Sequence, residues 1–537
     1  MARMPSTMGP SHDFARVPRA EIPRASFDRS NGYKTSFDAG QLIPVFSDEV
    51  LPGDTFALNM TAFCRLSTPL RPFMDNLFLN SFFFFVPLRL LWTNFQKFMG
   101  EQDNPGDSTS YTIPQIVAPA GGYAEQSLYD YFELPTKIAG FTHSALYLRA
   151  YNLIWNQWFR DQNLQNSIPK NMGDGPDSSA DYTVQKRGKR HDYFTGALPW
   201  PQKGPGVNIP LGGNAPVTGL AMTNNSTAAF ASVVAASGSE AAGDQPIGTS
   251  VWSVSAAQAM QVKAQSNAIP SGSNRPQIFA DLSAATGATI NQLRQAFQLQ
   301  KLQERDARGG TRYTEIVQAH FNVTSPDSRL QRAEYLGGGQ GMVNVHQVAQ
   351  VSASVAGQTP QGNLAAYGTA QVSGHGFTKS FTEHGIIIGL ISVRADINYQ
   401  QGLNKRWSRS TKYDFYWPAL AMIGEQAVLN LEIFTQGNAN DQLVFGYQER
   451  YAEYRYKPSV VTGKLRSNAA QPLDTWHLAQ NFASLPALNA AFIVDNPPIA
   501  RVVAVPSEPN FIGDFWFSLR CARPMPVFGV PGLIDHF

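Results

Sequence analysis

The stretches LNMTAFCRL, residues Leu58–Leu66, and FLNSFFFFV, residues Phe78–Val86, decide the fold class. Alternation at period two places one set of side chains on a single face of the first strand: Leu58, Met60, Ala62, Cys64 and Leu66. The second stretch is aromatic almost throughout, which is typical of a strand buried on both faces. The turn signal LPGD stands just before the first stretch. These patterns predict β-structure near the start of the chain.

Two more strand-like stretches stand in the last third of the chain. They are GIIIGLISVRADINYQ, residues Gly385–Gln400, and DFWFSLRCARPM, residues Asp514–Met525. Strands therefore come mainly from 37–100 and 377–537, and 101–376 reads as an insertion between them. Because strands and helices do not alternate along the chain, the simplest fold is one mainly β, antiparallel domain with long, partly helical insertions.

Two helices are expected inside the insertion. The first covers about 144–160, where a stripe at helical spacing is formed by Tyr147, Tyr151, Ile154 and Trp158. The second covers about 289–305, and its N-terminus has the spacing of a capping box, made by Thr289 and Gln292. We expect this second helix to turn an apolar stripe inward, formed by Ile290, Leu293 and Phe297.

The composition points away from a monomer with a fully exposed surface. Charged residues make up 15% of the 537 residues, against roughly 25% in ordinary soluble proteins. Hydrophobic residues make up 43%, enough for a sizeable core. A protein that covers its surface with copies of itself needs fewer charges. The net charge of +2 argues against DNA binding as the sole task, and two cysteines exclude a disulfide framework or a four-cysteine zinc site.

Residues 1–36 read as an extended basic N-terminal arm. They are rich in Pro and Arg, contain six basic against three acidic side chains, and have no hydrophobic period. We expect this arm to be ordered only against another surface. It has no apolar core of the signal-peptide type. The most apolar run, 77–92, is short for a membrane span and contains Asn80, Pro87 and Arg89, so we expect a soluble protein without membrane insertion.

Enzyme signatures are absent from the sequence, including Walker A, GxSxG and HExxH. GGGQG at 337–341 lacks the neighbours of a dinucleotide site and predicts a flexible loop. His375, Glu383 and His384 are close in sequence, but the paired His-x-His of a cupin is missing. We therefore expect no catalytic residue, cofactor or bound metal. The alternative that stays open is a jelly-roll carbohydrate-binding or metal-dependent, cupin-like protein.

Two basic clusters are candidates for contact with nucleic acid. The N-terminal arm contributes Arg16, Arg19 and Arg24. The sequence QKRGKRHD contributes Lys186, Arg187, Lys189 and Arg190. Such cations neutralise phosphates without reading the bases. The alternative for each cluster is a solvated basic loop.

The stretch FGYQERYAEYRYKPSVVTG, residues Phe445–Gly463, mixes aromatic side chains with charges of both signs. Three explanations are a subunit interface, a base-stacking strip and a strand edge protected by charge. The two glutamates Glu449 and Glu453 repel phosphate, which favours the interface. Its candidate residues are Tyr447, Arg450, Tyr451, Tyr454 and Arg455.

Four long stretches carry a family resemblance. They are SFDAGQLIPVFSDEVLPGDTF (36–56), KRHDYFTGALPWPQKG (189–204), FTEHGIIIGLISVRADINYQQGL (381–403) and FGYQERYAEYRYKPS (445–459). On these stretches the sequence resembles the major capsid proteins of the gokushovirus branch of the Microviridae, small single-stranded DNA viruses of bacteria. The stretches span the chain from end to end, and the segment 204–275 is the divergent part.

The resemblance implies that residues 37–537 form a single viral jelly roll, an eight-stranded antiparallel β-barrel with large insertions. It implies a T=1 icosahedral shell of sixty copies around circular single-stranded DNA, and hence a virion protein assembled in the cytoplasm of the bacterial host. The implied partners are further copies of the chain, the packaged DNA, a small basic DNA-packaging protein, a minor pilot protein and a host surface receptor. We expect the basic clusters to face the particle interior.

The resemblance also implies a protrusion on the three-fold axis, and 204–275 is the candidate segment. Its four charged residues are Glu240, Asp244, Lys263 and Arg275, too few for a freely solvated linker. Small side chains allow three copies to pack closely. The alternative is a disordered surface loop.

The two cysteines lie on an early and on the last predicted strand. We expect Cys64 and Cys521 to be buried and free, because assembly takes place in reducing cytoplasm. Pairing of these strands in one sheet allows the two thiols to be neighbours.

Overall fold

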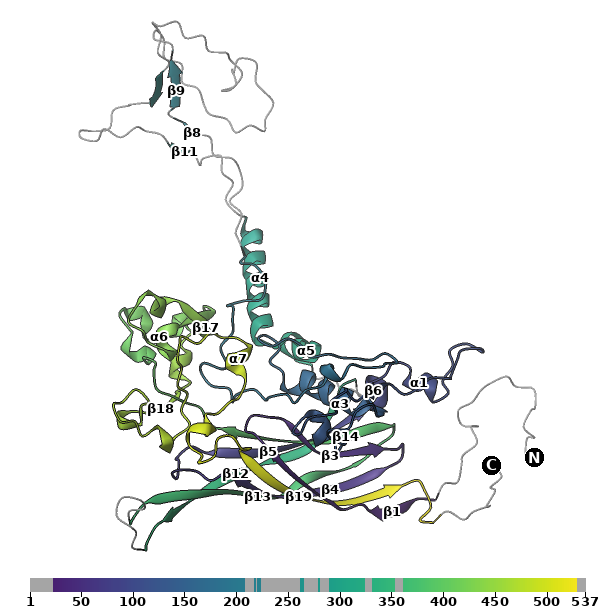
Figure 1. The fold of residues 1–537 in the computed structure, drawn as a ribbon. Helices are drawn as coiled ribbons and strands as arrows, with labels where there is room; N and C mark the ends of the chain where they lie inside the picture. Colours follow the sequence, from purple (N-terminus) through teal and green to yellow (C-terminus); the bar gives the residue numbers. More distant parts are fainter. Residues whose placement is uncertain are drawn as a thin grey trace, which may run out of the picture. The chain divides into compact units, whose positions relative to one another are not determined.

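The computed structural model describes residues 23–207, 217–218, 220–223, 261–264, 279–280, 289–323, 331–352 and 361–528 (Figure 1). The chain forms two compact units, one from Met1–Pro201 and Val323–Phe537 and the other from Gln202–Asn322. Within the described residues, no helix is long and apolar enough to cross a membrane.

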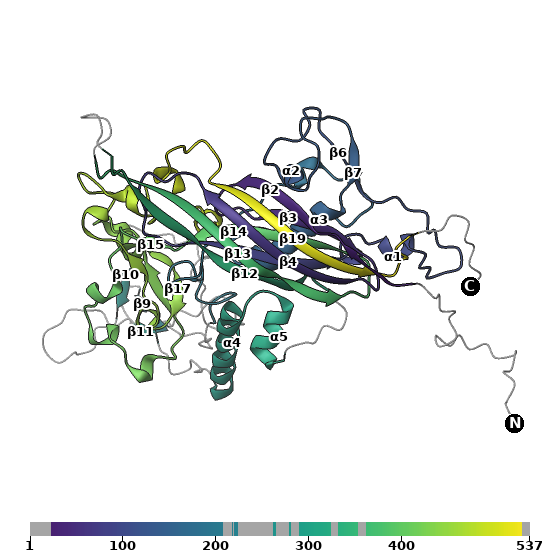
Figure 2. The same ribbon diagram turned by 90° about the horizontal axis from the view of Figure 1, so that it is seen from below.

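The larger unit is built around a nine-stranded antiparallel sheet. The strand order is β1-β19-β4-β13-β12-β5-β14-β3, and β2 also pairs with β19. The sheet curls, so that β3, β14 and β5 lie over β4, β13 and β19 (Figures 1 and 2). The prediction of a mainly β, antiparallel chain is therefore confirmed. The strands are β1 (Ala25–Asp28), β2 (Asn31–Phe37), β3 (Ile43–Val50), β4 (Thr55–Leu66), β5 (Leu77–Pro87), β12 (Glu334–Ala349), β13 (Leu364–Ser380), β14 (Gly385–Ala395) and β19 (Phe511–Arg523).

Two hydrophobic cores lie on the two sides of β5. The curled sheet encloses the larger core, to which β4 gives its alternate residues Leu58, Met60, Ala62, Cys64 and Leu66, as predicted. From β5, Phe83 and Phe85 enter this core, whereas Phe84 and Val86 enter the second core. The strand is thus buried on both faces, which its run of phenylalanines predicts.

The sequence 337–341, predicted to be a flexible loop, is part of β12, and this prediction is wrong. Glycines carry little strand propensity, but β12 needs them because neighbouring strands approach closely. A Cβ atom on Gly341 would lie 1.9 Å from Cγ1 of Val372, and one on Gly337 would lie 2.4 Å from the carbonyl oxygen of Gly376. β12 and most of β13 therefore belong to the sheet, although they fall within 101–376.

The end of the predicted N-terminal arm belongs to the same sheet. β1 and β2 pair with β19, and Phe37 at the end of β2 stacks on Phe511, with ring centroids 5.5 Å apart. Residues 23–36 are thus ordered against the last strand of their own chain. Arg16 and Arg19 lie outside the described residues.

The second core is covered by α3 (Leu146–Ile154), which continues into a π-helical turn (Trp155–Phe159). Tyr151 and Ile154 are fully buried, as the predicted stripe requires. Trp158 is 37% exposed, because the wider π-turn shifts it off the 3.6-residue period. The remaining short elements of this unit are α1 (Phe95–Phe98), α2 (Leu128–Tyr131), α6 (Asn430–Ile433), α7 (Ala490–Ile493), β6 (Gln115–Val117), β7 (Thr142–Ser144), β15 (Asn398–Tyr399), β16 (Glu425–Leu429), β17 (Val444–Glu449) and β18 (Ser459–Val460).

The smaller unit contains α4 (Ile290–Arg308), α5 (Tyr313–Phe321) and the short strands β8 (Val217–Thr218), β9 (Leu220–Thr223), β10 (Gln261–Ala264) and β11 (Phe279–Ala280). The predicted capping box is present, because Thr289 and Gln292 exchange hydrogen bonds. The predicted inner stripe is wrong: Ile290 and Phe297 are 70% and 65% exposed, and Ala307 is the buried residue of α4. Most of 204–275 lies outside the described residues.

Candidate functional site

The strip 445–459 forms an edge strand and a tight turn. β17 pairs with β16, and Tyr451 follows at a φ of 63°, which turns its ring inward. Tyr451 is 2% exposed, so it packs within the chain, whereas Tyr454 is 50% exposed. Tyr447 is half-buried and pairs through its backbone with Leu198. Arg455 forms an ion pair with Glu449.

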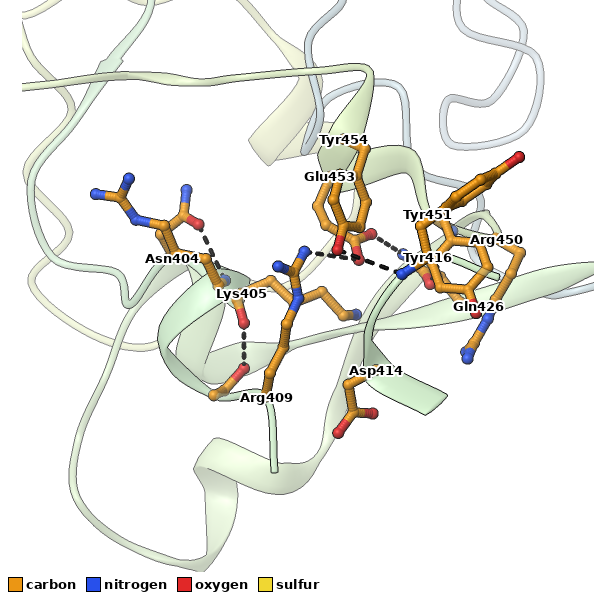
Figure 3. A network of polar contacts seen from close by, with 12 residues as sticks. Asn404, Lys405, Arg409, Asp414, Tyr416, Gln426, Arg450, Tyr451, Glu453 and Tyr454 are labelled. Atoms are coloured by element: carbon orange, nitrogen blue, oxygen red, sulfur yellow. Dashed lines mark hydrogen bonds and ion pairs between the residues drawn. The ribbon is translucent and has the colours of Figure 1, made fainter. Parts of the chain in front are cut away.

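A polar network joins this strip to a second segment, 403–424 (Figure 3). The Arg409 guanidinium lies over the Tyr454 ring, 4.4 Å from its centroid, and 3.6 Å from a carboxylate oxygen of Glu453. Glu453 accepts a 2.6 Å hydrogen bond from the amide of Gln426. Arg450 donates to the carbonyl of Tyr413 over 2.9 Å. The network thus connects Arg409 and the backbone of Tyr413 to the strip, although 403–424 has little regular structure.

The segment 403–424 presents large apolar side chains outward. Trp407 is 70% exposed and Met422 is 97% exposed. We call the exposed set the aromatic surface; it consists of Leu403, Trp407, Tyr413, Phe415, Tyr416, Trp417, Met422, Ile423, Leu443, Val444, Tyr454, Tyr456 and Val460. Large apolar side chains exposed close together in sequence are unusual for a soluble monomer.

Most of the aromatic surface was not predicted. Its signal is the sequence WSRSTKYDFYWPALAMI, residues 407–423, which mixes aromatic and charged residues in the way the predicted strip does. A search for mixed aromatic and charged residues would therefore have identified 407–423 as a second candidate stretch. Of the five predicted interface residues, Tyr454 lies in the aromatic surface, and Arg450 and Arg455 lie beside it.

The predicted basic loop is not freely solvated. Lys189 is 9% exposed, and the other three cations are half-buried. Lys186 donates to Asn496 over 2.8 Å, Arg187 donates to Asn80 over 3.0 Å, and Arg190 forms a 2.9 Å ion pair with Asp396. Arg24, from the arm, donates to Thr55 instead and is not part of this cluster.

Three cations of the loop line a cavity of about 490 Å³. Aromatic side chains form much of its wall: Phe82, Phe84, Trp158, Phe159 and Tyr335. The cations that line it are Arg187, Lys189, Arg190 and, from β14, Arg394. We call this cavity the basic-aromatic pocket. Arg394 escapes prediction because it lies more than 200 residues away in sequence, inside a stretch that reads as an ordinary strand.

Burial in the pocket makes the charged forms of its side chains less favourable. Burial, reinforced by Arg394, lowers the pKa of Arg187 to about 9, and burial lowers the pKa of Lys189 as well. Burial also raises the pKa of Asp495 to about 6, although Arg394, Lys189 and Arg187 oppose that rise. The shifts share one physical cause, which is charge removed from water.

The histidines and glutamate considered as metal ligands have other partners. His375 hydrogen-bonds through Nδ1 to Ser81 over 2.8 Å, and Glu383 forms a 2.7 Å ion pair with Arg89. His384 packs edge-on against Phe95. Among the described residues, no three His, Cys, Asp or Glu side chains form a metal-binding group.

Comparison with known proteins assigns the chain. A family model described as "Capsid protein (F protein)" matches residues 15–533. The chain belongs to this capsid protein family. It is 49% identical to capsid protein VP1 of Bdellovibrio phage phiMH2K, over 98% of both chains. It is 48% identical to VP1 of Chlamydia phage 1, over 99% of both, and 38% identical to VP1 of Spiroplasma virus 4, over 97% of both.

The resemblance to gokushovirus major capsid proteins is thereby confirmed. The protein is a phage capsid protein and is located in the virion. Its family is a structural one and is not a class of enzymes. The exposed aromatic surface and the basic-aromatic pocket are therefore features of a protein that builds a shell around a genome.

Proposed function

We propose that this capsid protein closes a T=1 shell of sixty copies, and that the aromatic surface is a contact between copies. The observation that carries the proposal is the outward display of Trp407, Trp417 and Met422 on a segment that the Arg409 network connects to the strip 445–459. Aromatic residues and arginine dominate the energetics of protein interfaces. Covering these side chains by a second copy removes apolar area from water.

The chemistry of the surface fits a second copy better than DNA. Glu449, Glu453 and Asp414 lie among its aromatic residues and repel phosphate. Two of these carboxylates hold arginines in place, in the pairs Arg409–Glu453 and Arg455–Glu449. An interface of this kind combines a rigid aromatic centre with a charged rim.

The finer features of the shell are part of the same proposal. The curled sheet supports an eight-stranded jelly roll over residues 37–537, extended by further strands. The segment 204–275 forms a three-fold protrusion and meets the host receptor. The shell encloses single-stranded DNA together with a small basic packaging protein and a minor pilot protein, and it assembles in the host cytoplasm.

The test is a double substitution, Trp407→Ser and Trp417→Ser. Both side chains are exposed, so the variant is expected to fold like the wild type by circular dichroism. We expect sedimentation and electron microscopy to show small oligomers in place of closed shells.

Trp516→Ser is the matched control, because Trp516 is 54% exposed on β19, outside the aromatic surface. Closed shells at wild-type yield from the double variant contradict the proposal. Equal loss of shells in the control shows that the effect is not specific to this surface.

A further inference from the structure

The basic-aromatic pocket contains more positive than negative charge. Arg190 is paired with Asp396, and Arg187, Lys189 and Arg394 share the carboxylate of Asp495, with Asp192 acting on Lys189 as well. Asp495 is 4% exposed, and its Oδ2 has no hydrogen-bond partner among the described residues. Buried cations in excess are costly unless an anion completes the site. The pocket therefore has the electrostatics of an anion site.

Arg394 makes an incomplete set of hydrogen bonds within the described residues. Its Nη1 donates to the Gly188 carbonyl over 3.2 Å. Its Nε is buried and has no hydrogen-bond partner in the part of the chain that the structure describes. An arginine fork of this kind is suited to planar or tetrahedral oxyanions, above all phosphate.

The aromatic wall offers flat faces near these cations. Phe84 packs against both Trp158 and Tyr335, with ring centroids 5.5 Å apart in each pair. Trp158 and Tyr335 are 37% and 44% exposed, so their rings remain accessible. Phe82 carries the Arg187 guanidinium 4.6 Å above its ring. Proteins that bind single-stranded nucleic acid commonly combine aromatic rings that stack on bases with cations that bind phosphates.

We propose that the basic-aromatic pocket binds one nucleotide of single-stranded DNA. Arg187 and Arg394 hold its phosphate, and Trp158 or Tyr335 stacks on its base. The cavity of about 490 Å³ lies within the range of roughly 300–1,000 Å³ that is usual for ligand pockets. The inference rests on the proposed shell around DNA, and it adds a defined site to what is otherwise diffuse neutralisation. Contacts to the phosphate and stacking on the base do not distinguish one base from another, so we expect binding to be independent of the DNA sequence.

Binding is tested with the full chain and a fluorescein-labelled oligodeoxythymidine of about ten nucleotides, followed by fluorescence anisotropy. In the variant Trp158→Ala/Tyr335→Ala we expect Kd to rise about tenfold. Arg394→Gln is a second variant, expected to weaken binding and to reduce the slope of log K against log salt by about one. An abasic oligomer of equal length keeps the phosphates and is expected to bind about tenfold more weakly than the thymidine oligomer.

Tyr413→Ala/Trp417→Ala is the matched control, since it removes two aromatic residues from the aromatic surface instead. We expect this control to bind DNA normally and to fail in shell assembly, whereas Trp158→Ala/Tyr335→Ala assembles normally. The proposed contact between copies and the proposed nucleotide site can therefore be refuted independently of each other. Unchanged DNA affinity in both pocket variants overturns the nucleotide site. Equal binding of the abasic oligomer, or equal competition by a polyglutamate peptide, shows a general anion site and overturns it too.

Discussion

The guanidinium group of Arg409 lies 4.4 Å from the ring centroid of Tyr454 and thereby ties the segment 403–424 to the turn after β17. We expect Arg409→Ala to release this segment and to reduce shell yield, with little change in the melting temperature of the subunit. Arg409→Lys keeps the charge but loses the planar stack, so we expect it to resemble the alanine variant. Limited proteolysis followed by peptide mapping measures the release. Equal protease resistance of the wild type and both variants contradicts this role.

The ion pair between Arg149 and Asp177 is the most deeply buried one among the described residues of the larger unit. Two hydrogen bonds of 2.7 Å join the side chains, which are 2% and 4% exposed. Because Arg149→Ala leaves a buried carboxylate unpaired, we expect it to lower the free energy of unfolding by about 3–5 kcal/mol. Lys137→Ala, at an exposed ion pair, is the control and is expected to leave the melting temperature unchanged.

Asp177 is also expected to make the stability of the subunit depend on pH. Burial alone would raise its pKa, but hydrogen bonds from Arg149 and Tyr182 outweigh burial and hold the pKa below its ordinary value. A carboxyl group with a lowered pKa stabilises the fold above the unfolded pKa, and this contribution is lost as pH falls through the folded pKa. We expect the wild-type melting temperature to fall below about pH 4, and the fall to be shallower in Asp177→Asn. Parallel curves for both proteins are the opposing outcome.

Cys64 and Cys521 are buried and free, as predicted, but they are not neighbours. Cys64 lies opposite Gly513 on β19, and Cys521 lies opposite Phe56 on β4, so eight residues of strand (64 − 56) separate them. That offset is about 26 Å, whereas a disulfide needs Cα atoms within about 7 Å. Burial raises the pKa of Cys64 to about 12 and raises that of Cys521.

We therefore expect neither thiol to react with Ellman's reagent in the native subunit, and both to react in denaturant. Mass spectrometry is expected to find no Cys64–Cys521 disulfide even after oxidation of native particles. Rapid modification of native subunits would show that the β4–β19 layer opens far more readily than its packing indicates.

The carboxyl group of Asp495 is expected to control DNA affinity. Its pKa is raised to about 6, so it takes up a proton as pH falls through that value. The cations acting on it include Arg187 and Arg394, whose pKa values, lowered to about 9 and about 10, still lie above this range. Affinity for the oligomer should therefore rise on acidification from pH 7.5 to pH 5, because the phosphodiester charge stays constant.

Asp495→Asn is expected to bind more tightly at pH 7.5 and to lose this pH dependence. His191 also lines the pocket, so His191→Gln is measured in parallel. If the pH dependence disappears in His191→Gln and persists in Asp495→Asn, the assignment to Asp495 is wrong.

Sequence reasoning predicts those parts of the fold whose signal is local. The buried face of β4 follows from alternation alone, and the burial of β5 follows from its phenylalanines. β12 could not be found in this way, because Gly341 is required by Val372 on the neighbouring strand and not by its own surroundings. Likewise, nothing local in α4 reveals that Phe297 is exposed.

In the candidate sites, too, the sequence predicts the features that depend on local residues and misses those that depend on the whole fold. The mixture of tyrosine and arginine in 445–459 is typical of an interaction region, and the basic loop indicates a region of positive charge. Which ring faces outward depends on one backbone angle, the φ of 63° at Tyr451. The pocket requires β14 to pair with β5, which brings Arg394 near the aromatic residues of that strand. Such pairing is a property of the whole fold.

The place of β19 in the sheet has a consequence for synthesis. This strand fills the gap between β4 and the pair β1 and β2, and its buried residues include Phe511, Phe515 and Phe517. A ribosome has to translate more than 500 of the 537 residues before β19 exists. Until then, β1, β2 and β4 lack their shared neighbour, and the main core stays open to water. Chains that terminate before β19 lack the residues that close the main core, so we expect them not to form the folded subunit.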